Sequence, residues 1–347
     1  RSCEKHILQC TSLTELNLNI SGLSWLLPRL VALPNLCSLN ISGSDVAAEH
    51  LPTIARLSQL EQLTLGFSDS LETRPQCLGH LSALMCLRKL DICNTFAADG
   101  NPCLRYLPLL PRLDSLRSDF NLDDSLSMLS RLSRLTKLHV SQAGSQAVPS
   151  SLGVLRTLTS LRSLDLSLFD TDSIDLDTWQ SSTLPHLTTL RRFSCYAELP
   201  WGVVNSLTPG LRTLRVHLRQ FEGSGHTEMR SFQHLSNLVS LHLQAHITDS
   251  LLSTLLGSLP PTLTDLDLSD NELTKDALPL FHSTGMSLRN VSLMSNGVSV
   301  AELEEAGLDL QVFSTDCAKC AAEESDDDDD DDDDDGDDDD DDDDDDD

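Results

Sequence analysis

The sequence predicts an α/β solenoid, an arc with short parallel strands on its concave side and helical segments on its convex side. Two observations predict it. Apolar residues recur about twelve times at positions 1, 4 and 6 of a repeating unit, and successive copies start 21 to 29 residues apart. Aromatic residues make up only 4% of the 347-residue chain, so the core of such a stack must be aliphatic.

The apolar triplets can be followed in order along the chain. In the eighth copy either Leu187 or Leu190 fits position 1, and Leu190 is preferred because it keeps all three positions apolar. The copies are Leu13, Leu16, Leu18; Leu36, Leu39, Ile41; Leu60, Leu63, Leu65; Leu87, Leu90, Ile92; Leu113, Leu116; Leu135, Leu138, Val140; Leu161, Leu164, Leu166; Leu190, Phe193, Cys195; Leu211, Leu214, Val216; Leu238, Leu241, Leu243; Leu263, Leu266, Leu268; and Leu288, Val291, Leu293.

Each copy is expected to supply one strand and one return segment. Side chains alternate along a strand, so positions 4 and 6 enter the core while positions 3, 5 and 7 face outward. The return segments show helical apolar spacing, as in residues 251–259 and 126–132. Helices are wider than strands, so the stack bends with the sheet on its concave side. An enclosed pocket is not expected in such an arc.

One segment carries a family resemblance. Residues 264–271, TDLDLSDN, resemble the strand and turn of the leucine-rich repeat of the intracellular type, and Asn296 occupies the same place in the next copy. That place elsewhere holds Ser21, Ser44, Ser68, Thr95 or Ala143. The resemblance covers residues 11–313 and implies a repeat domain over residues 1–313, with residues 300–313 as its C-terminal cap. Residues 1–10 are short for an N-terminal cap, which we expect to lie upstream.

The acidic charge is concentrated at the C-terminal end. The formal net charge is −31, and two aspartate runs at 326–335 and 337–347 hold 21 carboxylates, which leaves 34 acidic residues against 24 Lys and Arg. Residues 314–347 are therefore expected to be a linker and a disordered tail. Such a tail should repel nucleic acid and attract basic proteins such as histones, or serve only as a solubility element.

Signatures of catalysis and cofactor binding are missing from the sequence. It has no glycine-rich phosphate loop, no zinc-protease histidine pair and no serine elbow. Residues 170–177 lack the glycine and glutamate of a calcium loop, and Cys317 and Cys320 are half of a zinc site. We expect no enzyme activity, no cofactor and no metal.

The setting is expected to be intracellular, in the cytoplasm or nucleus. The ten cysteines are scattered and are interpreted as reduced thiols, and no apolar run is long enough to cross a membrane.

The outward positions predict a partner-binding surface. Positions 3, 5 and 7 gather cations and histidines in the middle of the concave face, where they could meet an acidic or phosphorylated partner, or simply keep the sheet soluble. The acidic tail could also fold back onto them and compete with that partner. The candidate partner-binding residues are Lys137, His139, Arg192, Arg215, His217 and His242.

These features favour a non-enzymatic scaffold or adaptor that binds other proteins. A repeat arc followed by an acidic tail is similar to the acidic leucine-rich nuclear phosphoproteins, which bind histones, and to the Ran GTPase-activating proteins. The alternatives are a GTPase-activating protein of the Ran type and the substrate-recognition subunit of a ubiquitin ligase. All three functions are expectations from architecture.

Overall fold

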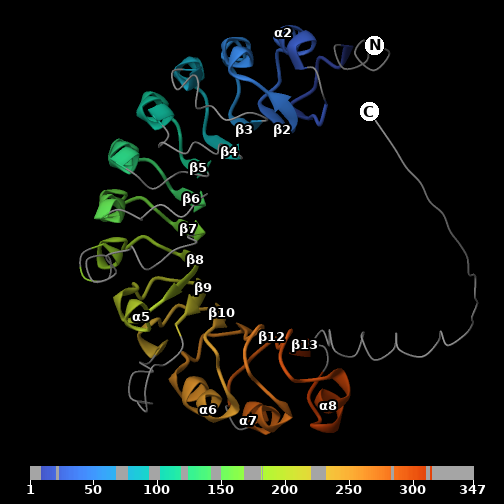
Figure 1. Ribbon diagram of the computed structural model, residues 1–347, viewed down its shortest axis with the longest axis vertical. Helices are drawn as coiled ribbons and strands as arrows, with labels where there is room; N and C mark the ends of the chain where they lie inside the picture. Colours follow the sequence, from blue (N-terminus) through green and yellow to red (C-terminus); the bar gives the residue numbers. More distant parts are fainter. Residues whose placement is uncertain are drawn as a thin grey trace, which may run out of the picture.

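The computed structural model is an arc built on one parallel sheet (Figure 1). It describes residues 9–20, 23–67, 77–93, 102–118, 124–141, 150–167, 181, 183–219, 232–282, 285–309 and 313–314. Within them the sheet has thirteen strands that follow one another in chain order. They are β1 (Glu15–Asn17), β2 (Ser38–Val46), β3 (Gln62–Phe67), β4 (Lys89–Cys93), β5 (Ser115–Ser118), β6 (Lys137–Ser141), β7 (Ser163–Ser167), β8 (Arg192–Leu199), β9 (Thr213–Leu218), β10 (Ser240–Gln244), β11 (Asp265–Asp267), β12 (Asn290–Ser292) and β13 (Phe313–Ser314).

The apolar triplets set the strand register. Leu16 pairs with Leu39, and position 4 of each copy then pairs with position 4 of the next as far as Val291. In the eighth copy Phe193 pairs with Leu164 and Cys195 with Leu166, which confirms the register that starts at Leu190. A leucine-rich arc with a concave parallel sheet is therefore confirmed as the fold class.

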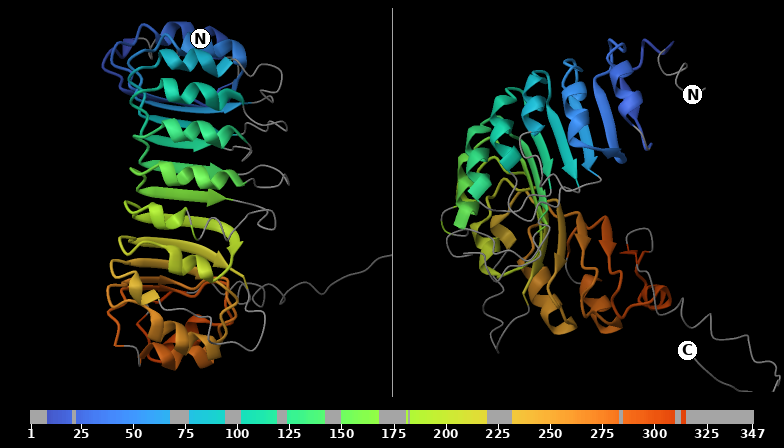
Figure 2. Two further views of the ribbon diagram at one scale, coloured as in Figure 1. Left: turned by 90° about the vertical axis from the view of Figure 1, so that its left-hand side faces the viewer. Right: turned by 45° about the horizontal axis from the view of Figure 1, so that its top comes forward.

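Helical segments cover the convex side, as both views in Figure 2 show. Most are short 3₁₀ helices, including the segment over residues 126–132, because the return segments are too short for several α-helical turns. In the described residues no helix is long and apolar enough to cross a membrane. The 3₁₀ helices are η1 (Leu23–Trp25), η2 (Ala48–His50), η4 (Cys77–Ala83), η5 (Pro102–Leu109), η6 (Asp124–Arg131), η7 (Ser150–Thr157), η8 (Leu184–His186), η10 (Phe232–His234) and η11 (Lys275–Ala277); the α-helices are α2 (Leu27–Leu30), α3 (Leu51–Ile54), α5 (Gly202–Ser206), α6 (Asp249–Ser258), α7 (Leu278–His282) and α8 (Val300–Glu305).

Helix α8 and strand β13, which begin and end the segment that we expected to act as a cap, add a further rung. Helix α8 begins with a capping box in which Ser299 Oγ accepts from Glu302 N while Glu302 Oε2 accepts from Ser299 N. Phe313 then pairs with Val291, so β13 extends the sheet by one strand that the twelve-copy pattern did not predict.

The core lies between sheet and helices and is mostly leucine, with Phe193 and Phe232 as its largest fully buried side chains. Polar side chains bind the turns of successive copies together. Asn271 Oδ1 accepts from Ala245 N and Ile247 N at 2.9 and 3.0 Å, and its Nδ2 donates to Leu243 O at 2.8 Å. Ser44, at the equivalent place in the second copy, makes only one bond of each kind, to Ile20 N and Leu18 O.

Candidate functional site on the concave face

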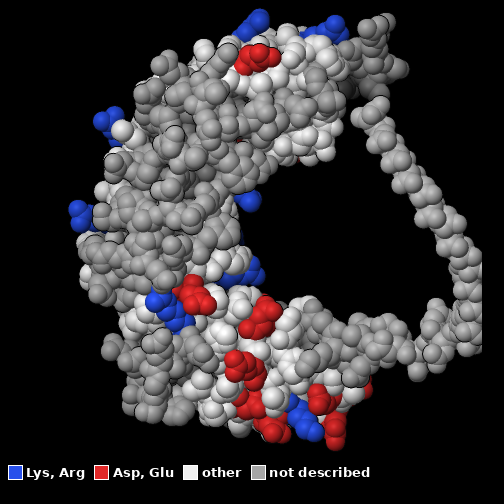
Figure 3. Space-filling view, viewed as in Figure 1, with Lys and Arg blue, Asp and Glu red and all other residues white. Residues whose placement is uncertain are grey.

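The six candidate residues all lie on the concave side of β6, β8, β9 and β10. In the row at position 3, Lys137 and Arg192 are both paired with Ser163, one on each side of β7. In the row at position 5, Arg215 lies directly beside His242. We call these six residues the concave patch: Lys137, His139, Arg192, Arg215, His217 and His242. The space-filling view shows Lys and Arg facing the hollow near the middle of the arc and acidic residues nearer its C-terminal end (Figure 3).

The three histidines of the concave patch are each held by a carboxylate on a neighbouring strand. His139 Nδ1 lies 3.1 Å from Asp165 Oδ2, and His242 Nδ1 lies 2.5 Å from Asp267 Oδ2. His217 Nε2 lies 3.8 Å from Glu198 Oε1. A carboxylate thus stands beside each imidazole and would offset a positive charge on it, so the three histidines add little to the positive potential of the face.

Two residues of these pairs have shifted pKa values. Burial lowers the pKa of His217, against the opposing effect of the Glu198 carboxylate, so its imidazole is neutral at neutral pH. Burial alone would raise the pKa of Asp267, but hydrogen bonds from His242 and Ser269 outweigh it and lower the pKa from 3.8 to about 2. Asp267 is therefore fully ionised across the physiological range.

Arg215 is held over an exposed aromatic ring. Its Nη1 donates to Tyr196 Oη at 2.9 Å, and its Cζ lies 5.9 Å from the centre of the Tyr196 ring. Tyr196 is 51% exposed. Sequence analysis missed this residue, although its place at position 7 of the eighth copy marks it as an outward aromatic side chain. An exposed tyrosine fixed beside an arginine is typical of the contacts that dominate protein interfaces.

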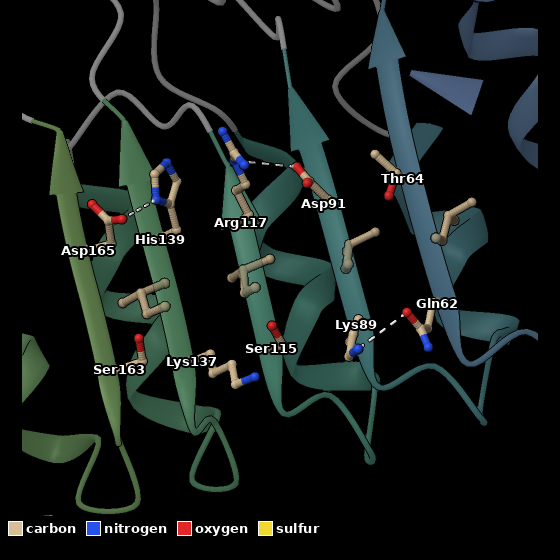
Figure 4. A pocket seen from close by; sticks show the side chains of 14 residues that line it. Gln62, Thr64, Lys89, Asp91, Ser115, Arg117, Lys137, His139, Ser163 and Asp165 are labelled. Carbon is tan, nitrogen blue, oxygen red and sulfur yellow. Dashed lines mark hydrogen bonds and ion pairs between the residues drawn. The ribbon is translucent and has the colours of Figure 1, made fainter. Parts of the chain in front are cut away.

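A shallow depression of about 330 Å³ lies on the concave face over β3 to β7. Figure 4 shows its side chains in two rows, with Lys89 and Lys137 in one and Arg117 and His139 in the other. Lys89 Nζ donates to Gln62 Oε1 at 3.3 Å, and Arg117 Nε lies 4.0 Å from Asp91 Oδ1. The depression therefore continues the row of Lys137 toward the N-terminal copies.

The described residues contain no group of three or more His, Cys, Asp or Glu side chains that could hold a metal ion. Both candidate metal segments, residues 170–177 and the pair Cys317 and Cys320, lie outside the described residues. Among the described cysteines, Cys37, Cys86 and Cys195 are free thiols. Burial raises the pKa of the Cys195 thiol to about 12, so this thiol stays protonated and is a poor nucleophile.

Comparisons with known proteins support the fold. No family model and no curated protein matches the sequence. Among solved structures, the internalin InlF from Listeria monocytogenes is similar with a TM-score of 0.54 and 20% identity, over 91% of this chain and 93% of that one. A leucine-rich-repeat protein from Leptospira interrogans gives 0.47 and 19% over 90% and 86% of the two chains. TLR13, solved in complex with ssRNA13, gives 0.48 and 19% over 78% of this chain and 41% of that one. With its ladder of apolar triplets in register and its likeness to the internalin, this chain has the leucine-rich-repeat fold.

Proposed function

We propose that the chain is a non-enzymatic scaffold whose concave face binds an acidic or phosphorylated segment of a partner protein. The observation that carries the proposal is the set of exposed cations at the middle of the sheet, Lys137, Arg192 and Arg215, beside the exposed ring of Tyr196.

The cations of this set are available to a ligand. Among the residues that the structure describes, Lys137 and Arg192 have no ion-pair partner, and Arg215 is held by the phenol of Tyr196 rather than by a carboxylate. Guanidinium groups bind carboxylate and phosphate through two parallel hydrogen bonds, which adds specificity as well as affinity. A charged partner segment that covers Tyr196 would also bury its ring.

The histidines of the concave patch have a different role in this proposal. Because Asp165, Glu198 and Asp267 already hold them, we assign them to the shape of the surface rather than to its charge. Binding should therefore depend on Lys137, Arg192 and Arg215 more strongly than on His139, His217 or His242.

The aspartate runs give the chain a second way to bind proteins. A dense row of carboxylates attracts lysine-rich proteins such as histones, and salt should weaken that attraction. These residues lie outside the described part of the chain, so the proposal rests on their sequence alone. The free thiols of Cys37, Cys86 and Cys195 favour an intracellular setting, in the cytoplasm or nucleus.

A pull-down from cell extract with chemical cross-linking tests the role of the concave face. The full chain is compared with a variant carrying Arg192→Glu and Arg215→Glu, and with a control carrying Arg29→Glu and Arg56→Glu, which changes the net charge equally outside the concave face. We expect the first variant to recover roughly tenfold less of its partners than the full chain does, since reversed charges repel an acidic segment. If both variants retain the same partners, the concave face is not the binding surface.

A further inference from the structure

Three arginines stand at the edge where strands β7, β8 and β9 begin. Arg162, Arg191 and Arg212 each occupy position 2, directly before the first residue of their strand, and all three are exposed. Arg191 N donates to Arg162 O and Arg212 N donates to Arg191 O, both at 2.8 Å. The three residues are therefore direct neighbours across the sheet, with backbones about 4.8 Å apart.

Lys137 and Arg192, at position 3 of β6 and β8, adjoin these arginines. We call the five residues Lys137, Arg162, Arg191, Arg192 and Arg212 the basic ridge. The other residues at positions 2 and 3 of β6 to β9 are Thr136, Ser163 and Thr213, so no carboxylate is interleaved with the cations.

The charge of the basic ridge is unmatched within the described part of the chain, where none of its members forms an ion pair. Arg191 is fixed by donating from Nη1 to Gly210 O at 3.0 Å and to Leu190 O at 3.3 Å. A Cβ added at Gly210 would lie 2.2 Å from this Nη1, so a larger residue there would displace the guanidinium from its present place. Five adjacent cations repel one another, and a polyanion laid along them would remove that repulsion.

The spacing of the cations favours a run of adjacent anions over a single anion. Strands β6 to β9 span three strand spacings, about 14 Å. An extended chain advances about 3.3 Å per residue, so about four or five consecutive acidic residues would cover the basic ridge. The chain itself contains such a segment, the ten aspartates at 326–335.

We propose that the basic ridge docks the aspartate run of its own chain, residues 326–335, when no partner is bound. Eleven residues lie between Ser314, in β13, and Asp326. The two are thus twelve residue steps apart, which reach about 40 Å when the chain is extended. Along the sheet, β9 lies about 19 Å and β6 about 34 Å from β13, so the run can reach every member of the basic ridge. Tethering also gives the run an effective concentration in the millimolar range, far above that of most free ligands.

This inference rests on the proposed function, because an acidic partner would use the same side of the sheet. The aspartate run then competes with that partner, and a docked run is not free to bind basic proteins. Binding of an acidic segment to the concave face therefore releases the aspartates for a second, basic partner. The two binding activities of the chain become coupled.

The test measures binding of a fluorescein-labelled peptide copying residues 326–335 by fluorescence anisotropy at low ionic strength. The full chain is compared with a full-length variant in which serine replaces the 21 tail aspartates. We expect the serine-tailed chain to bind the peptide at least about tenfold more tightly than the parent, since the parent's own tail occupies the site. In the serine-tailed background, Arg162→Gln, Arg191→Gln and Arg192→Gln together should abolish binding, while the matched control Arg29→Gln, Arg56→Gln and Arg289→Gln should retain it.

Two outcomes overturn the inference. Equal affinity of the parent and serine-tailed chains would show that the tail does not occupy the basic ridge, although an acidic ligand still binds there. Absence of binding to the serine-tailed chain, or binding that survives the three ridge substitutions, would show that the basic ridge is not the site for aspartate runs. Neither result bears on the pull-down with Arg192→Glu and Arg215→Glu, which tests the proposed function separately.

Discussion

At the scale of single residues, charged side chains on the concave face divide into those committed to the fold and those left for a ligand. Asp267 is committed: Oδ2 contacts His242 Nδ1, and Oδ1 accepts from Ser269 N at 3.0 Å and from Ser269 Oγ at 2.6 Å. Lys137 makes no such contact among the described residues. Adding up the charged residues of the sheet therefore overestimates the charge that a partner would meet, because the charge on paired residues is already neutralised.

Substitution of Asp267 by Asn should show this commitment. A native pKa of about 2, below the ordinary 3.8, stabilises the fold above about pH 4, and the stabilisation is lost as the pH falls toward 2. Because the side chain is a third exposed, we expect Asp267→Asn to lower the free energy of unfolding by only about 1 kcal/mol at neutral pH. Urea unfolding at a series of pH values measures the difference between the two chains, which should shrink below pH 4.

The control for this substitution is Asp270→Asn, which removes an exposed carboxylate in the same turn. Asp270 has a φ of 58°, a left-handed conformation that asparagine tolerates. Its effect on unfolding should be small at every pH. A difference between Asp267→Asn and the parent that stays constant from pH 7 to pH 2 would contradict the assignment.

At the scale of strands and turns, the sequence predicts what periodicity controls and misses what depends on neighbours. The twelve triplets predict the register because a one-residue slip would expose the leucines at positions 4 and 6. The same alternation correctly places Lys137 and Arg215 on the concave face. The alternation says nothing of position 2, which lies before each strand begins, and there Arg162, Arg191 and Arg212 are exposed. Ion pairs such as that of His139 with Asp165 join neighbouring strands, so they appear only when residues at the same position of adjacent copies are compared.

Loss of a polar side chain from a turn should lower the free energy of unfolding more when that side chain makes more hydrogen bonds. Asn271→Ala would leave Ala245 N, Ile247 N and Leu243 O unpaired in a buried turn, so we expect unfolding to become easier by about 2 to 3 kcal/mol. Ser44→Ala removes one bond to Ile20 N and one to Leu18 O and should cost about 1 kcal/mol. Urea unfolding of both variants measures the two costs. A larger effect at Ser44 than at Asn271 would contradict the hydrogen-bond account.

At the scale of the whole molecule, the repeats stand in a single row, and this arrangement affects both stability and binding. Among the described residues each strand pairs with its neighbours in the chain, so a repeat is supported chiefly by the repeats next to it. The cations of the basic ridge lie on β6 to β9 or directly before these strands. Acidic residues gather nearer the C-terminal end of the arc (Figure 3). The proposed binding region is therefore in the middle of the array, away from both ends of the sheet.

Because the repeats form a row, we expect the same leucine-to-alanine substitution to disturb different parts of the arc, depending on where in the row it is made. Leu293→Ala and Leu164→Ala each remove a fully buried leucine and should each cost about 2 to 4 kcal/mol. Hydrogen exchange should rise only in residues 285–309 for Leu293→Ala, since the damage stays next to the last strands, and binding of the acidic peptide by the serine-tailed chain should persist. Leu164 lies in β7, among the strands that carry the basic ridge, so for Leu164→Ala exchange should rise on β6 to β9 and the peptide should bind more weakly. Uniformly faster exchange in both variants would instead mean that the arc unfolds as a single cooperative unit. A substitution at the end of the array would then also destabilise the binding region in its middle.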